Sequence, residues 1–160
     1  MKCVVIYASR TGNTRTIAEA IAAGLRPRGT VEMLSVADAP TAFAEGTDLV
    51  IIGGPTEAHG MTEQVTRFLD RLEPGALQGK AAAGFDTRLR WPRFLSGSAA
   101  AGITERLRRS GARVMAPAES FIVNMKPLLE PGEAERAEAW AAWLADRLEA
   151  KTRPFVGSTA

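Results

Sequence analysis

Apolar and polar positions follow one another along the chain in blocks that predict alternating strands and helices. Unbroken apolar runs, such as Cys3–Tyr7, are typical of strands that are buried on both faces of a parallel sheet. Apolar residues three and four positions apart, such as Ile17, Ile21 and Leu25, indicate amphipathic helices. We predict strands near 2–8, 31–36, 48–54, 80–86 and 112–116, and helices near 13–25, 62–72, 98–110 and 133–150.

This order of elements predicts a single α/β domain, built as a doubly wound parallel sheet of five strands with helices on its faces. A short loop is expected between the second and third strands. Residues 117–132 hold three prolines and a second short apolar run, Ser120–Val123, which indicates a broken or extended fifth strand followed by a loop. The domain is expected to span 1–151, with a frayed tail over 152–160.

In such sheets ligands bind outside the carboxyl ends of the strands, which selects the loops 9–14, 54–61 and 86–97. The first loop leads into a helix N-terminus, where free N–H groups attract anions. Ser9, Thr11, Asn13 and Thr14 add side-chain donors around Gly12. The loop therefore predicts a phosphate cradle, and the alternative is an N-capped helix behind an ordinary polar loop.

Two common phosphate-binding motifs do not match the first loop. A P-loop NTPase needs a lysine followed by Ser or Thr, whereas here Gly12 is followed by Asn13-Thr14. A dinucleotide-binding turn needs three glycines, and this loop has one. Ser-x-Thr-Gly-x-Thr after a strand instead resembles the FMN-phosphate loop of the flavodoxin family, and residues 48–72 resemble the third strand, flavin loop and third helix of that family.

The resemblance implies a sheet in the strand order 2-1-3-4-5, FMN as cofactor and electron transfer as activity. It places the isoalloxazine ring between the second and third loops, with Trp91 as a stacking aromatic; the alternative is an indole folded onto the protein or offered to a partner. His59 either lies against the ring or points into water. The expected cofactor-binding residues are Ser9, Arg10, Thr11, Gly12, Asn13, Thr14, Pro55, Thr56, Glu57, Ala58, His59, Gly60, Thr87, Arg88 and Trp91.

The resemblance also implies a role for Gly60 when the flavin is reduced, because reduction adds a proton to a ring nitrogen. A flexible peptide here would rotate its carbonyl to accept that hydrogen, and glycine tolerates the positive φ that the rotation requires. The alternative for Gly60 is a helix-entry turn.

Charge and cysteine usage bear on partners and compartment. The chain has 20 Lys and Arg against 18 Asp and Glu, and seven of the arginines lie within 84–113. This segment is either a solvated face or a docking surface for an acidic redox partner. A single cysteine, Cys3, agrees with a reducing cytosol, and neither a secretory signal nor an apolar run of membrane length is visible, so we expect a cytoplasmic protein with no membrane or nucleic-acid partner.

Three functions fit these features. The first is an FMN-binding electron carrier, which needs no substrate acid or base; none is visible around the lone histidine, His59, nor is a metal cluster. The second is an FMN-dependent NAD(P)H:quinone reductase on the same scaffold. The third is a binding domain of the same fold that has lost FMN. The electron carrier is favoured over a substrate-specific oxidoreductase.

Overall fold

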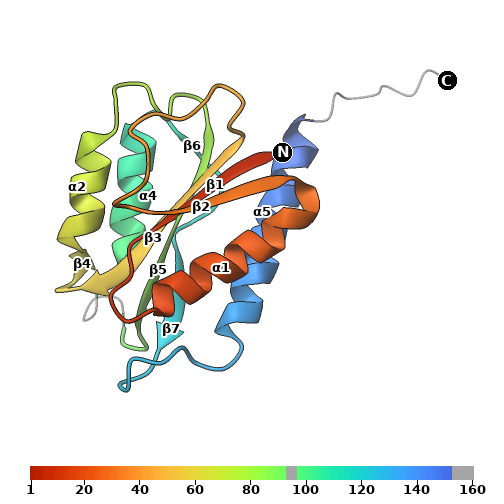
Figure 1. The fold of residues 1–160 in the computed structure, drawn as a ribbon. Coiled ribbons are helices and arrows are strands. Elements are labelled where there is room, and N and C mark those ends of the chain that lie inside the picture. Colours follow the sequence, from red (N-terminus) through yellow and green to blue (C-terminus); the bar gives the residue numbers. More distant parts are fainter. Residues whose placement is uncertain (93–96, 153–160) are drawn as a thin grey trace.

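The computed structural model describes residues 1–92 and 97–152, which form one central sheet between two layers of helices (Figure 1). Helices α1 (Asn13–Leu25) and α5 (Glu133–Thr152) cover one face, while α2 (Glu63–Arg71) and α4 (Ala99–Arg109) cover the other. A short 3-10 helix, η1 (Arg26–Arg28), follows α1. Each layer buries its own apolar cluster against the sheet, so the predicted doubly wound α/β fold is confirmed.

The sheet runs in the order β2-β1-β3-β5, with β6 and β7 together in the fifth position beside β5. All of these neighbouring strands are parallel. The bounds are β1 (Lys2–Tyr7), β2 (Thr30–Ser35), β3 (Leu49–Glu57), β5 (Ala81–Leu89), β6 (Arg113–Val114) and β7 (Glu119–Val123). The order is the predicted 2-1-3-4-5, and the strand order reverses between β1 and β3.

The fifth strand is broken, as predicted, but its first part is shorter than the predicted strand near 112–116. β6 is only two residues long and pairs with the start of β5, and β7 resumes the pairing opposite Phe85. Between them, residues 115–118 stand opposite only Ala83 and Gly84, and they include Pro117, which has no N–H to donate to a strand ladder.

Two strands run further than the sequence predicts. β3 and β5 each continue three residues past the predicted ends, to Glu57 and Leu89, and they remain paired through Pro55 and Thr87. A two-residue strand, β4 (Gly60–Met61), then folds back antiparallel onto the end of β3. The second and third predicted loops therefore begin as extended strands, which gives both of them a fixed direction away from the sheet.

The remaining boundaries lie close to the predictions. Residues 36–48 join β2 to β3 without a helix or strand, as expected. Helix α5 includes Thr152, one residue beyond the predicted end of the domain, and the rest of the predicted tail lies outside the described residues. Cys3 is buried in the core, and this burial raises the pKa of its thiol to about 11. None of the helices in the described part of the chain is both long and apolar enough to span a membrane.

Candidate functional site

The first loop joins the end of β1 to the start of α1 around the hydroxyl of Ser9. Ser9 Oγ accepts hydrogen bonds from the main-chain N–H groups of Gly12 (3.1 Å) and Arg15 (3.4 Å). Gly12 is the N-cap residue of α1 and has a φ of 91°, a left-handed conformation that favours glycine; a Cβ there would meet no neighbouring atom, so backbone conformation rather than space explains the glycine. The loop is thereby held open at the positive end of a helix, the place where an anion binds.

Thr14 and Thr87 turn their hydroxyls toward each other, away from the surface of this loop. Both residues are buried, and their Oγ1 atoms are 2.8 Å apart. The pair ties the first turn of α1 to the end of β5. The hydroxyl of Thr14 thus has a buried partner within the protein, and its contact with a phosphate stays a prediction. The main-chain N–H of Thr14 lies at the start of α1.

A fourth loop, which the sequence did not point to, reaches the phosphate loop. Asn13 Nδ2 donates to Thr11 Oγ1 (3.1 Å) and to the carbonyl of Pro127 (2.6 Å), in the connection between β7 and α5. Figure 1 shows this connection passing below the start of α1. Asn124 shapes it by accepting main-chain hydrogen bonds from Lys126 and Leu128, the local turn that asparagine favours.

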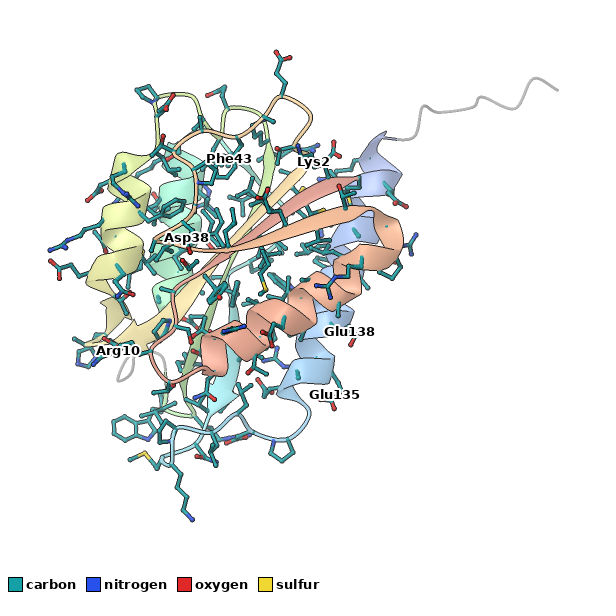
Figure 2. All side chains as sticks on the ribbon, in the orientation of Figure 1. Lys2, Arg10, Asp38, Phe43, Glu135 and Glu138 are labelled. Carbon is teal, nitrogen blue, oxygen red and sulfur yellow. The ribbon has the colours of Figure 1, made fainter. Side chains whose placement is uncertain are left out.

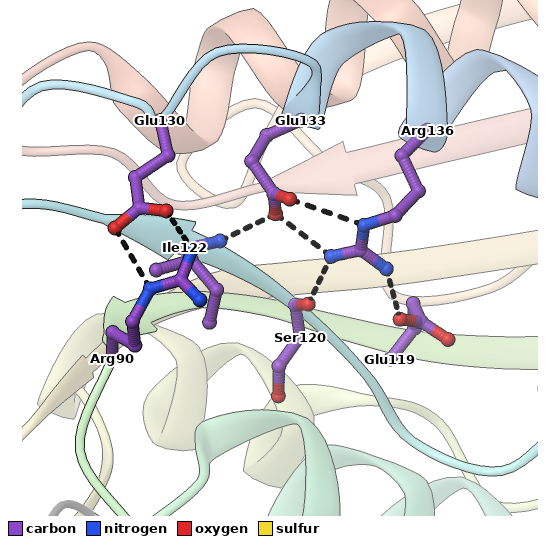
Figure 3. Close-up of polar contacts among 7 residues, drawn as sticks. All are labelled: Arg90, Glu119, Ser120, Ile122, Glu130, Glu133 and Arg136. Carbon is purple, nitrogen blue, oxygen red and sulfur yellow. Dashed lines mark hydrogen bonds and ion pairs between the residues drawn. The ribbon is translucent and has the colours of Figure 1, made fainter.

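Ion pairs anchor the same connection to the sheet (Figure 3). Glu133, at the start of α5, accepts a hydrogen bond from the N–H of Ile122, while Arg136 pairs with Glu133 and Glu119. The hydrogen bond with Glu133 is the main reason that the pKa of Arg136 is raised. The start of α5 is therefore fixed against β7, and the connection of residues 124–132 is held at both of its ends.

The second loop is a tight hairpin between β3 and β4. Thr56 pairs with Met61 and Glu57 with Gly60, so that Ala58 and His59 form a two-residue turn. Their φ angles are 44° and 72°, whereas Gly60 is outside the left-handed region. Gly60 is thus held outside the left-handed region by the hairpin pairing, and positive φ falls on two residues with side chains, at an energetic cost. The rotation of this peptide on flavin reduction stays a prediction.

The side chains of the second loop have mixed exposure. His59 is exposed, and its backbone forms a bridge with Gly97 of the third loop. Arg10, labelled at the edge of the molecule in Figure 2, pairs with Glu57 at 3.0 Å and so joins the first loop to the second. Both partners of this pair are partly or largely exposed, so we expect it to contribute little to stability.

Two arginines of the third loop, Arg88 and Arg90, have partners within the protein. Arg88 Nη1 donates to the carbonyl of Trp91 (2.7 Å), and Arg90 pairs with Glu130 (Figure 3). The hydrogen bonds from Arg90 lower the pKa of the Glu130 carboxyl. Trp91 is 50% exposed, and Arg93 lies outside the described residues. The predicted arginine cluster is thus partly neutralised by the acidic residue opposite it.

Residues 4–90 match a family model described as a flavodoxin domain, which is more than half of the chain. The chain belongs to the flavodoxin domain family. This confirms the resemblance read from the phosphate loop and from residues 48–72, and membership of the family implies FMN as the cofactor.

Individual flavodoxins and one enzyme are similar to parts of the chain. A flavodoxin of Aquifex aeolicus is 34% identical over 95 residues, which cover 56% of this chain and 51% of that protein. An NAD(P)H dehydrogenase (quinone) of Acidovorax ebreus is 33% identical over 109 residues, covering 52% and 54%. The chain thus spans about half the length of the curated relatives it matches. Oxidised Flavodoxin 1 from Bacillus cereus has a similar structure, with a TM-score of 0.76, 28% identity and coverage of 91% of this chain and 98% of that one.

The residues present fit the phosphate group of FMN. The start of α1 supplies main-chain N–H groups, Gly12 holds the loop in a left-handed turn, and Ser9 and Thr11 add hydroxyls beside them. The second and third loops project from neighbouring strands of the same sheet edge. This flavodoxin-family domain therefore brings all three predicted loops together, although it turns Thr14 and Thr87 toward each other.

Proposed function

We propose that this protein binds FMN and transfers electrons between redox partners. The observation that carries the proposal is the phosphate loop: a glycine in left-handed conformation and two hydroxyl side chains at the start of α1, inside the segment that matches the flavodoxin domain. When bound, FMN supplies the redox chemistry, by accepting and releasing electrons. The protein supplies binding and orientation.

Within this proposal the three loops have different tasks. Ser9, Thr11 and Asn13 hold the phosphate, together with main-chain N–H groups of the first turn of α1. The 54–61 hairpin and the 86–91 segment hold the ring on either side, with Pro55, Ala58 and His59 on one side and Trp91 on the other. The indole of Trp91 is half-exposed, and stacking on a ring would contribute about 0.5–1.5 kcal/mol beyond buried area.

One absorbance spectrum tests this function. The purified protein should be yellow or become yellow with added FMN, and the chromophore released on denaturation should run with FMN rather than FAD in chromatography. Protein that is colourless, and that leaves the fluorescence of added FMN unquenched, would contradict the proposal and favour a binding domain that has lost its cofactor.

We also propose that the redox partner docks at the carboxyl edge of the sheet with an acidic surface. The exposed side chains Trp91, Met125 and Leu128 lie on loops of this edge, and Lys126 stands between the last two. The chain as a whole has a net charge of +2. We further propose that the protein works in the cytoplasm, because a buried cysteine without a disulfide, Cys3, suits a reducing compartment.

A second candidate function is FMN-dependent reduction of quinones by NAD(P)H. Two observations favour it: the similarity to the Acidovorax ebreus enzyme over about half of each chain, and a cavity of about 690 Å³ on the β2 side of the phosphate loop. Arg15, Arg67 and Arg71 line this cavity and would suit the phosphates of a nicotinamide nucleotide. Anaerobic addition of NADPH decides between the two: bleaching of the FMN absorbance supports the enzyme, and an unchanged spectrum supports the carrier.

A further inference from the structure

A buried carboxylate, which is not among the predicted cofactor-binding residues, lies where the second and third loops leave the sheet. Asp86 has no solvent exposure and is paired in register with Gly54 of β3. Its Oδ2 atom accepts three hydrogen bonds, from Thr56 Oγ1 (2.9 Å), Ser98 Oγ (2.8 Å) and the main-chain N–H of Ala100 (2.9 Å). One oxygen atom thus joins the end of β3, the end of β5 and the start of α4.

The donors around Asp86 are themselves fixed. Thr56 Oγ1 accepts a hydrogen bond from the N–H of Ala99 (2.8 Å) while it donates to Asp86, and Ser98 caps α4 by accepting from the N–H of Ala101 (3.2 Å). Neither hydroxyl can turn away without breaking a second bond. The 54–61 hairpin, the end of β5 and the start of α4 are therefore locked to one another beneath the surface.

Packing alone does not explain a carboxyl group at this position. A buried carboxylate loses its hydration, and within residues 1–92 and 97–152 Asp86 has no cationic partner and its Oδ1 atom has no hydrogen-bond partner. The N-terminus of α4 compensates in part, through its N–H groups and its dipole. An apolar residue of similar size would avoid the cost, so the carboxylate is expected to have a task beyond folding.

We propose that Asp86 is a positioning residue for the flavin ring and also lowers the reduction potential of bound FMN. Through Thr56 and Ser98 it sets the spacing of the two ring-holding loops. Its negative charge, poorly screened because it is buried, opposes the addition of an electron to a ring held between those loops. This inference rests on the FMN binding proposed above.

Charge and positioning are separated by two kinds of variant. Asp86→Asn removes the charge and keeps the shape. Thr56→Val and Ser98→Ala keep the charge and each remove one hydrogen bond to it, together with the bond that the hydroxyl accepts from the start of α4. Asp146→Asn is the matched control, because it removes the same charge from an exposed ion pair with Arg28 on the outer face of α5. Each variant is measured for FMN affinity by fluorescence quenching, for the visible spectrum and for midpoint potential.

Asp86→Asn should raise the potential, an increase that corresponds to about a tenfold gain in affinity for reduced over oxidised FMN, because the neutral amide no longer repels the added electron across a medium with an effective dielectric constant of about 20. Thr56→Val and Ser98→Ala should weaken FMN binding about tenfold each and change its spectrum, with the potential changed less than in Asp86→Asn.

The outcomes separate the two proposals. Wild-type protein that takes up no FMN overturns both. If the wild type binds FMN and Asp86→Asn has the potential of the Asp146→Asn control, FMN binding stands and the proposed effect of the Asp86 charge on the potential is wrong. Should Asp86→Asn fail to fold, the other two variants decide: unchanged FMN affinity and spectrum in both overturn the inference, and weakened binding with an altered spectrum supports it.

Discussion

At the residue scale, Ser9, Thr11 and Thr14 belong to one motif but have different surroundings. The side chain of Thr11 is exposed and accepts a hydrogen bond from Asn13, whereas that of Thr14 is buried against Thr87. Thr11→Ala should therefore weaken FMN binding about tenfold or more, the value of a hydrogen bond to a charged group. Riboflavin, which has no phosphate, should bind Thr11→Ala and wild type equally well in the same fluorescence titration. Equal loss for both ligands would mean that Thr11 supports the loop rather than the phosphate.

The contact between Thr14 and Thr87 is tested by the free energy of unfolding rather than by FMN binding. Thr14→Val leaves the Thr87 hydroxyl buried without its partner, which costs about 1–3 kcal/mol of unfolding free energy. The double variant Thr14→Val/Thr87→Val removes both hydroxyls and should recover part of that loss, as judged by urea denaturation. Additive losses in this double-mutant cycle would show that the two hydroxyls do not interact.

The sequence carried a signal for the burial of Thr14 that the motif obscured. Positions 14, 17, 18 and 21 share one face of a helix, and the other three are apolar core residues. Helical periodicity therefore places Thr14 inward, while the motif resemblance places it at a phosphate. Its partner, Thr87, comes from a strand 73 residues away, and no local pattern could identify such a contact.

At the element scale, the packing of α1 against α5 depends on Gly24. A Cβ at this position would lie 2.2 Å from the main-chain carbonyl oxygen of Glu138, which Figure 2 labels on α5. Gly24→Ala should lower the unfolding free energy by about 1–3 kcal/mol through overpacking, although alanine favours a helix by about 1 kcal/mol. Gly46→Ala, where a Cβ would meet nothing, is the matched control. Equal stability of the two variants in urea would contradict the close approach of these helices.

Helix positions were predictable from the sequence because each helix has an apolar face and a recognisable end. Strand ends were less predictable, since Pro55, Thr56 and Thr87, which follow the predicted strands, have the composition of a loop. They continue β3 and β5 because tertiary contacts satisfy their polar groups: Thr56 bonds to Asp86, and Thr87 to Thr14. An extended polar segment that is paired through side chains cannot be told from a loop by hydrophobic periodicity.

At the scale of the whole molecule, the site could be located from topology alone. Alternating strands and helices predict a parallel sheet, and the reversal of strand order selects the loops at its carboxyl edge. The contribution of residues 124–130 was beyond reach, because it depends on Asn13 bonding to Pro127, 114 residues later in the chain. The net charge of the docking surface could not be predicted from the sequence either, since Glu130 offsets the charge of Arg90 in the arginine-rich segment.

Exposed charge at the carboxyl edge should affect electron transfer to small ionic acceptors. Lys126 lies on the connection that contacts the phosphate loop, so a positive potential there should attract an anionic oxidant to the nearby flavin. Oxidation of the reduced protein by ferricyanide should slow as salt rises past 0.1 M, where the Debye length is about 10 Å. Lys126→Glu should slow this reaction about two- to threefold at low salt and accelerate oxidation by the cationic hexaammineruthenium(III). Lys151→Glu makes the same charge change near the end of α5. Equal rates for the two variants would remove the electrostatic argument for an acidic partner, while FMN affinity should be unchanged in both.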